Sequence, residues 1–446
     1  MNLIPEFIQR RIAHRPNLVK IVDNIGWLFF DKILRMGVGL FVGVWIARYL
    51  GPEQFGLFNF AAAFVGLFAT IAGLGLQSIV VRDIVRNPAC TEKTLGTAAA
   101  LQFCSGLCAY GLIISTIFWL RSDDVMAKLL VAVLGTAVLF KASEVAVYWF
   151  ESQVLSKYTV WVQNVCFVGF AAMKVLFVLK SAPLLAFALA TMAEAIVVAI
   201  LMLVMLNLHG PNLRQLRITA TRAKELLADS WPLLLSGIAI MIYMKIDQVM
   251  LGQMVDDEAV GIYSVAVRIS EVWYFIPIMI AASVFPAILE TKKRSEGQYY
   301  KRLQYLYDLV TWLSICVALP MTFLSSFVVI LLFGEAYAAA GGVLAIHVWA
   351  GLFVSMGVAR GKWLLAENLQ NIGYWYIGLG MITNVVCNYL AIPYFGMTGA
   401  AFTTLISQAV TAIIAPALFQ KTRISSWMLL SSLNPTHCYR LIRSFE

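Results

Sequence analysis

The stretch LLAFALATMAEAIVVAILMLVML, residues 184–206, decides the fold because only one of its residues, Glu194, is charged. A helix needs about 20 mostly apolar residues to cross the hydrocarbon core of a bilayer. A charge inside such a segment costs a few kcal/mol, so it normally faces a partner or a water-filled cavity. The stretch therefore predicts a membrane-spanning helix whose single charge has a structural or functional role.

Eleven further apolar runs of this kind fill the chain. Of the 446 residues, 61% are hydrophobic and 13% are charged, whereas about 25% of the residues of a soluble domain are charged. The predicted spans are 25–49, 57–78, 95–120, 129–150, 158–179, 184–206, 231–254, 261–289, 303–333, 338–358, 372–392 and 400–419. The pattern predicts an all-α polytopic membrane protein of about twelve transmembrane helices, in two pseudo-symmetric six-helix lobes around a central cavity.

The polar stretch 207–230 divides the apolar runs into two sets of six. We therefore expect an N-terminal lobe over 1–206 and a cytoplasmic linker over 207–230. A C-terminal lobe over 231–419 and a cytoplasmic tail over 420–446 complete the predicted organisation. The loops are too short to hold a nucleotide-binding domain, and no GxxxxGK[ST] run is present, so we expect no ATPase within the chain.

The distribution of basic residues predicts the topology. With the N-terminus in the cytoplasm, 23 of the 33 Lys and Arg residues fall on the cytoplasmic side and three on the other side. Basic residues collect in the cytoplasmic loops of membrane proteins. Both termini are therefore expected in the cytoplasm, where the N-terminal segment would act as an anchor, rather than as a signal peptide, through Arg10, Arg11, Arg15 and Lys20. The net charge of +9 then reflects topology, and no nucleic-acid partner is expected.

The two halves of the chain contain a weak internal repeat. Placing Gly56 on Gly261 also aligns Glu53 with Glu258, at an external loop that begins the second helix of each half. Equivalent ends lie on the same side of the membrane, so the repeat is parallel. Parallel repeats build transporters whose substrate site lies between the two halves.

Three segments carry a resemblance to a known family: ARYLGPEQFGLFNFA (47–61), LFGEAYAAAG (332–341) and PYFGMTGAAFTTLIS (393–407). With two sets of six spans, they resemble the O-antigen (Wzx-type) polysaccharide flippases. These belong to the multidrug/oligosaccharidyl-lipid/polysaccharide (MOP) exporter superfamily, which also contains multidrug extruders and the lipid II flippase. The resemblance covers almost the whole chain, through diffuse motifs at loop edges.

The resemblance implies a function and a location. Family members move an oligosaccharide linked to undecaprenyl pyrophosphate across the bacterial inner membrane by alternating access, often driven by an ion gradient. It thus implies a multi-pass protein of that membrane, surrounded by membrane lipid, with a lipid-linked oligosaccharide as substrate. Polysaccharide polymerase or assembly proteins are further possible partners.

Charged residues within the spans suggest where the substrate binds. Lys32, Arg35, Lys245 and Arg268 lie well inside helices of both halves. Arg holds phosphate oxygens through a two-pronged fork of hydrogen bonds, and Lys acts as a compact point charge. We therefore predict that these four cations bind the pyrophosphate.

Ion coupling requires a titratable acid near that site, and Asp31, Asp247 and Glu271 are the candidates; the coupling ion would be a proton or sodium. A simpler interpretation is that the acids only balance neighbouring charges. The pairs Asp31/Arg35, Lys141/Glu144 and Arg268/Glu271 are spaced to share a helix face and form such ion pairs.

Two other functions compete with a flippase. A multidrug exporter of the same superfamily would need an acidic or aromatic cavity for cationic drugs, which the buried cations disfavour. A membrane enzyme of polysaccharide assembly would need a large loop that carries acids or metal ligands, and the longest loop is mainly basic. We expect no enzyme activity, no cofactor and no metal, since no histidine pair completes a metal set around the seven cysteines.

Overall fold

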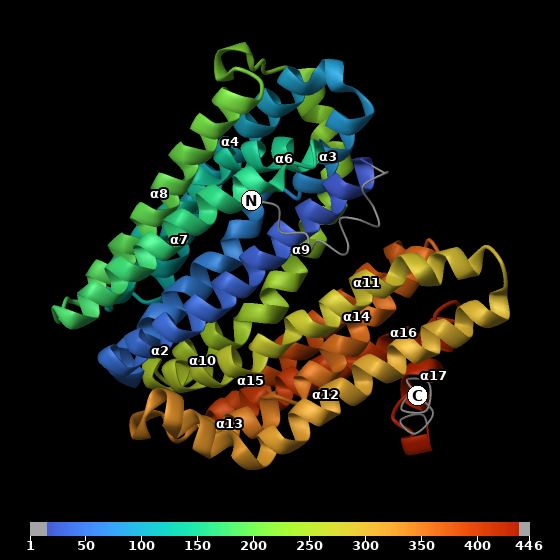
Figure 1. Cartoon of the computed structure of the whole chain (residues 1–446). Helices are drawn as coiled ribbons and strands as arrows, with labels where there is room; N and C mark the ends of the chain where they lie inside the picture. Colours follow the sequence, from blue (N-terminus) through green and yellow to red (C-terminus); the bar gives the residue numbers. More distant parts are fainter. Residues whose placement is uncertain (1–15, 437–446) are drawn as a thin grey trace. The chain divides into compact units, whose positions relative to one another are not determined.

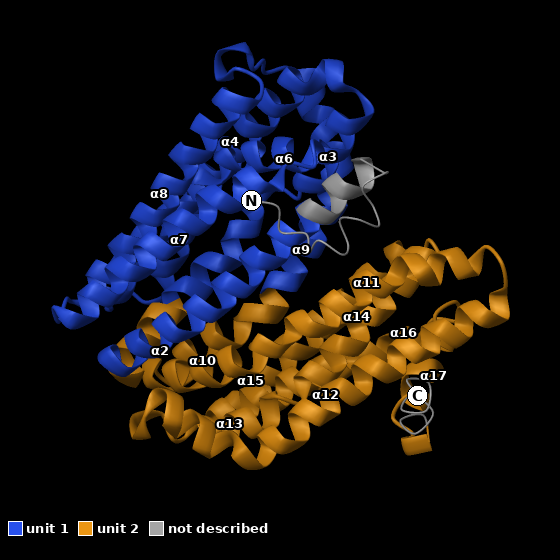
Figure 2. Cartoon of the chain, in the orientation of Figure 1, with its two compact units in different colours: residues 1–50, 61–241 blue, residues 51–60, 242–446 orange. Residues whose placement is uncertain are grey.

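The structure, a computed structural model, describes residues 16–436, with side chains from residue 24 onward (Figure 1). The predicted anchor residues Arg10, Arg11 and Arg15 lie outside the described residues, as do the side chain of Lys20 and the end of the predicted tail. The chain forms two compact units, which are described separately below. Unit 1 comprises residues 1–50 and 61–241, and unit 2 comprises residues 51–60 and 242–446 (Figure 2).

Unit 1 consists of helices. The boundary between the two units falls within α9, after Met241. The elements are α2 (Pro16–Gly73), α3 (Gln77–Arg86), η1 (Pro88–Cys90), α4 (Thr91–Leu120), α5 (Val125–Gly135), η2 (Thr136–Ser143), α6 (Glu144–Ser152), α7 (Ser156–Leu179), α8 (Leu184–His209), η3 (Leu213–Gln215) and α9 (Ala220–Met254).

Unit 2 holds the last part of α9 and the remaining helices. Its further elements are α10 (Asp257–Glu271), η4 (Val272–Tyr274), α11 (Phe275–Lys292), α12 (Glu296–Phe333), η5 (Glu335–Tyr337), α13 (Ala340–His347), α14 (Ala350–Ala366), α15 (Gln370–Ala409), η6 (Val410–Ile414), α16 (Ala415–Leu418) and α17 (Arg423–Ser431). The prediction of an all-α polytopic protein is confirmed.

Ten helices in the described part of the chain are long and apolar enough to cross a membrane. Two of them, Asn24–Arg86 with 63 residues and Gln370–Leu418 with 49, are far longer than one crossing requires. Each is broken at a glycine in the left-handed region, Gly51 with φ 72° and Gly396 with φ 52°. Each break lies between two predicted spans, which reconciles the ten helices with the predicted twelve crossings.

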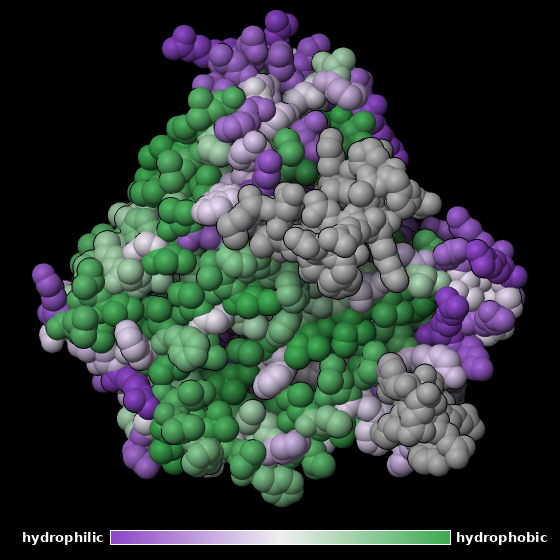
Figure 3. Space-filling view, in the orientation of Figure 1, coloured by the Kyte–Doolittle hydropathy of each residue, from purple (hydrophilic) through white to green (hydrophobic). Residues whose placement is uncertain are grey.

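The surfaces of the helices suit a lipid environment. On the face drawn in Figure 3, hydrophobic side chains cover the sides of α7 and α8 in unit 1 and of α12 in unit 2, and hydrophilic side chains gather at helix ends. Trp119 is 82% exposed and Phe323 is 80% exposed. Such large exposed apolar side chains are costly in water and favourable against acyl chains.

The internal repeat has a structural counterpart in unit 2. Gly56 lies against the carbonyl oxygen of Asp257, and Gly261 lies against that of Pro52; a Cβ on either glycine would overlap the facing oxygen. The alignment of Gly56 on Gly261 also places Pro52 on Asp257. The two contacts are therefore equivalent under the repeat, and the helices cross with backbone against backbone at this point. We call it the glycine crossing.

Two ion pairs in unit 1 neutralise charges inside the spans. Lys141 Nζ lies 2.6 Å from Glu144 Oε1, which confirms the pair predicted from their spacing. Lys174 Nζ lies 3.0 Å from Glu194 Oε2 and joins α7 to α8, a pairing that no local spacing indicated. The single charge of the stretch 184–206 thus has a structural partner.

Candidate functional site

In unit 1, the predicted site residues Asp31, Lys32 and Arg35 occupy adjacent turns of α2. Arg35 Nε donates to Asp31 Oδ1 at 2.7 Å, and Arg35 Nη2 donates to Gln163 Oε1 at 3.4 Å. The guanidinium also stacks over the ring of Phe167, 5.2 Å from its centroid. Asp31 therefore holds Arg35 in a fixed position, as the simpler interpretation of their spacing predicted.

Lys32 differs from its neighbours on α2. Its side chain is exposed in unit 1, and in the part of the chain that the structure describes it has no hydrogen bond or ion pair. A solvated ammonium of this kind costs little to keep charged, and it is available to an anionic ligand.

In unit 2, Lys245 of α9 and Arg268 of α10 share one acid. Both cations interact electrostatically with Glu271, yet within residues 24–436 neither forms a direct ion pair. The prediction that Arg268 and Glu271 form such a pair is therefore wrong. The guanidinium carbon of Arg268 instead lies 5.6 Å from the centroid of the Phe55 ring.

Lys245 and Arg268 lie near two carboxylates, because Asp247 also acts electrostatically on Glu271. These charges are surrounded by apolar helices, where the dielectric constant is low and a charge acts strongly on an ion nearby. A phosphate group would supply the acceptor oxygens that Lys245 and Arg268 lack within the described residues.

Asp247 has surroundings that its position in the sequence did not reveal. It is 4% exposed and lies only two residues from Lys245 on α9, but its carboxylate faces a cluster of neutral polar groups. Oδ2 accepts from the hydroxyl of Tyr263 at 2.8 Å and from that of Thr404, and Oδ1 accepts from Asn388 Nδ2 at 2.6 Å. These bonds offset part of the cost of burying the carboxylate.

The cluster around Asp247 extends along α15. Asn388 Oδ1 accepts from Thr403, Asn388 Nδ2 also reaches Asn384 Oδ1 at 3.2 Å, and Asn384 Nδ2 donates to Ser407 Oγ at 3.4 Å. These side chains come from both sides of the break at Gly396. Carboxylate, amide and hydroxyl oxygens are the donors that hard cations prefer, so this Asp247 cluster has the chemistry of a small-cation or proton site.

Sequence reasoning found only part of this cluster. It singled out Asp247 as a candidate acid, close in sequence to the predicted ligand Lys245. It missed Tyr263 and Thr404, which lie 16 and 157 residues from Asp247 in the chain. The available signal was the group of hydroxyl residues in TTLIS at 403–407, within one of the three segments that carry the family resemblance.

Comparisons with curated proteins point to glycan assembly. The probable low-salt glycan biosynthesis flippase Agl15 of Haloferax volcanii is 24% identical over 426 residues, which cover 91% of this chain and 86% of that protein. The probable flippase AglR of the same organism is 29% identical over 210 residues. That match covers 44% of this chain and 43% of AglR, so the chain spans less than half of that relative.

Comparisons with solved structures concern the fold. The lipid II flippase MurJ in an inward closed conformation matches with a TM-score of 0.73 and 14% identity, over 92% of this chain and 91% of that one. An inward-facing multidrug resistance MATE transporter of the MOP superfamily matches with a TM-score of 0.68 and 18% identity, over 90% and 96% of the two chains. The fold is thus shared by flippases and drug exporters and does not choose between them.

A family model described as "Polysaccharide biosynthesis protein" matches residues 21–292. This range holds most of the predicted site residues on α2, α9 and α10, and it is more than half of the chain. Together with the helices and the charged residues described above, it shows that the chain belongs to the polysaccharide biosynthesis protein family.

Proposed function

We propose that this protein is a flippase, which moves an oligosaccharide linked to undecaprenyl pyrophosphate from the cytoplasmic to the periplasmic leaflet of a bacterial inner membrane. The observation that supports this most is the family match, because it coincides with the segment that carries the four predicted ligands on α2, α9 and α10. The likeness to Agl15 over nearly the whole chain agrees with it. Both termini would then lie in the cytoplasm.

The pyrophosphate would be held by Lys32, Arg35, Lys245 and Arg268. A diphosphate carries about two negative charges and many acceptor oxygens, which suit guanidinium and ammonium groups. No chemical bond of the substrate needs to break, so the protein would act as a transporter and not as an enzyme. Asp247 would couple this movement to a proton or sodium gradient, since its cluster offers oxygen donors away from the cations.

The direct test of this function uses a strain that lacks the protein. Such cells should accumulate lipid-linked repeat units on the inner leaflet, and re-expression of the chain should clear them. Proteoliposomes provide the matching measurement, the rate at which a labelled lipid-linked oligosaccharide becomes accessible on the opposite leaflet. Unchanged leaflet distribution in the deletion strain would contradict the proposal.

Neutralising the predicted pyrophosphate ligands should slow transport. Arg268→Gln and Lys245→Gln should each reduce the initial rate by about 10- to 100-fold, because a hydrogen bond to a charged group is worth ~1.5–3 kcal/mol. Arg35→Gln should have a smaller effect, since Asp31 already compensates part of its charge. Lys180→Gln, at an exposed position between α7 and α8, is the control and should transport normally. Wild-type rates in Arg268→Gln, Lys245→Gln and Arg35→Gln would rule out these three residues as ligands.

The likeness to a MATE transporter favours a second candidate, a multidrug exporter. Exporters of cationic, amphipathic drugs need a site that attracts positive charge, whereas the predicted ligands are the four cations Lys32, Arg35, Lys245 and Arg268. We therefore expect cells with and without the protein to accumulate a cationic dye equally. Measuring dye fluorescence in the two strains separates the candidates, and protein-dependent dye efflux would favour the exporter.

A further inference from the structure

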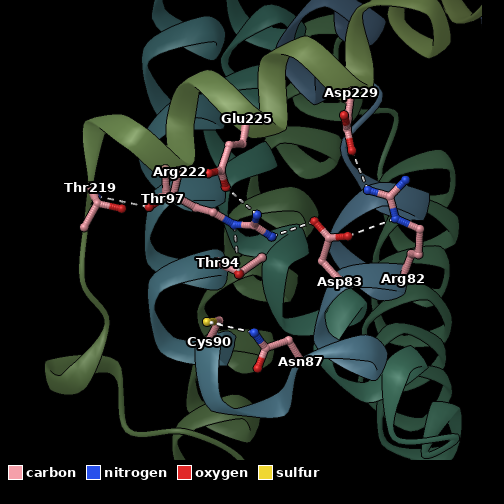
Figure 4. A network of polar contacts seen from close by, with 10 residues as sticks. All are labelled: Arg82, Asp83, Asn87, Cys90, Thr94, Thr97, Thr219, Arg222, Glu225 and Asp229. Atoms are coloured by element: carbon pink, nitrogen blue, oxygen red, sulfur yellow. Dashed lines mark hydrogen bonds and ion pairs between the residues drawn. The ribbon is translucent and has the colours of Figure 1, made fainter.

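A charged cavity of about 460 Å³ lies at one end of unit 1, where α3 ends and α4 and α9 begin. Figure 4 shows the polar contacts that surround it. Its lining residues are Arg82, Asp83, Arg86, Asn87, Cys90, Lys93, Arg222, Glu225 and Asp229. None of these belongs to the predicted pyrophosphate site or to the Asp247 cluster.

The three acids of the cavity are already bound to arginines. Asp83 accepts from Arg82 Nε at 2.9 Å and from Arg222 Nη2 at 2.6 Å. Asp229 pairs with Arg82 Nη2, and Glu225 accepts from Arg222 Nη1 at 2.8 Å. Arg222 Nε donates to Thr94 Oγ1 at 3.3 Å, so each of the three nitrogens of this guanidinium makes a hydrogen bond.

Two cations on the cavity lining remain without a partner. Arg86 at the end of α3 and Lys93 in the first turn of α4 are exposed, and neither makes a hydrogen bond or ion pair within the described residues. Arg82 bonds to its acids through Nε and Nη2, which leaves Nη1 as a further donor. The hydrogen-bond donors of the lining that lack an acceptor therefore belong to positively charged side chains.

The charge of the lining selects the class of ligand. Four cations and three carboxylates leave one net positive charge, which one phosphodiester would neutralise. A phosphodiester also accepts several charge-assisted hydrogen bonds, as Arg86 and Lys93 require. The cavity volume of about 460 Å³ is far larger than the ~10–15 Å³ that one water molecule needs by the same measure, and it has room for a headgroup.

The surroundings indicate a lipid rather than a free anion. Exposed apolar side chains lie on the helices that frame the cavity: Val85 on α3 is 60% exposed, and Leu227 and Trp231 on α9 are 40% and 59% exposed. Trp is enriched where helices meet the membrane–water interface. Basic pockets between transmembrane helices at the cytoplasmic interface bind anionic headgroups.

We propose that this cavity binds the phosphodiester headgroup of an anionic phospholipid through Arg86 and Lys93. The ion pairs Asp83–Arg222 and Arg82–Asp229 hold α3 and α9 together and so give the cavity its shape. The lipid would be a ligand of the protein and not its transported substrate, so the proposal does not depend on the transport function.

The test measures lipid binding by the purified full-length protein. Native mass spectrometry and the melting temperature are followed as phosphatidylglycerol or phosphatidylcholine is added. Phosphatidylglycerol should bind and stabilise the protein, and phosphatidylcholine should not. The double variant Arg86→Gln/Lys93→Gln should bind phosphatidylglycerol at least about tenfold more weakly, because both charged donors are lost.

The matched control removes the same charge outside the cavity. Arg214 and Lys224 are exposed in the same part of unit 1 but do not line the cavity, so Arg214→Gln/Lys224→Gln should keep the wild-type affinity. Equal weakening in both double variants would overturn the proposal. Inorganic phosphate should not compete; displacement of the lipid by phosphate at millimolar concentration would show a free-anion site and overturn the lipid assignment.

Discussion

Replacing Asp247 by asparagine is expected to uncouple transport from its driving gradient. Asp247 is the only charged side chain in the hydrogen-bonded cluster with Tyr263, Asn388 and Thr404. Asparagine has nearly the same volume but carries no negative charge to balance a bound cation and has no carboxyl proton to release. Flipping by the variant in proteoliposomes should therefore proceed at one low rate, with or without an imposed sodium or pH gradient.

The control for this experiment is another buried acid of unit 2. Asp308 on α12 is 3% exposed, and its carboxylate accepts from Gln304 at 2.7 Å. Asp308→Asn removes an equally buried charge outside the cluster, and its transport should still respond to the gradient. If the Asp247→Asn variant kept a gradient response like that of the wild type, Asp247 would not be the coupling residue.

Replacing Gly261 by alanine should lower the stability of the protein. The new Cβ would overlap the backbone carbonyl oxygen of Pro52, which no side-chain rotation can move aside. Overpacking typically lowers the free energy of unfolding by ~1–3 kcal/mol. We expect a loss at the upper end of this range, because a clash with the backbone forces the two helices apart. Gly56→Ala should have a comparable effect through Asp257. Thermal unfolding in detergent measures both losses.

Gly378 on α15 provides the matched control for the glycine crossing. A Cβ there would meet nothing within 4 Å, so Gly378→Ala makes the same chemical change without a clash. Alanine is favoured over glycine in a helix by roughly 0.5–1 kcal/mol, so this variant should be unchanged or slightly more stable. A Gly261→Ala protein as stable as Gly378→Ala would contradict the close packing of the crossing.

The helices could be predicted well from the sequence because a membrane span is determined by the composition of one continuous segment. Runs of apolar residues such as 184–206 need no tertiary information, and pairs such as Asp31/Arg35 need only helical spacing. The two long broken helices were predicted as separate spans, and the breaks at Gly51 and Gly396 fall in the gaps between those spans. Local spacing failed for Arg268 and Glu271, where Lys245 from another helix competes for the same acid.

The binding chemistry was less predictable because it depends on distant segments. Asp247 was selected for its nearness to Lys245, yet its partners Tyr263, Asn388 and Thr404 come from two other helices. At the charged cavity, Arg222 of α9 donates to Asp83 of α3, and the two residues are 139 positions apart in the sequence. Neither arrangement follows from spacing along one helix, so both became visible only once the helices were packed.

The glycine crossing has a consequence for the origin of the chain. A contact in which Gly56 meets Asp257 while Gly261 meets Pro52 is reciprocal, like the self-complementary interface of a two-fold symmetric homodimer. A half-length ancestor could have made this contact with a second copy of itself before the two genes fused. The glycine crossing would then be older than the fused polypeptide. The side chains around it that differ between the two halves would have diverged after the fusion.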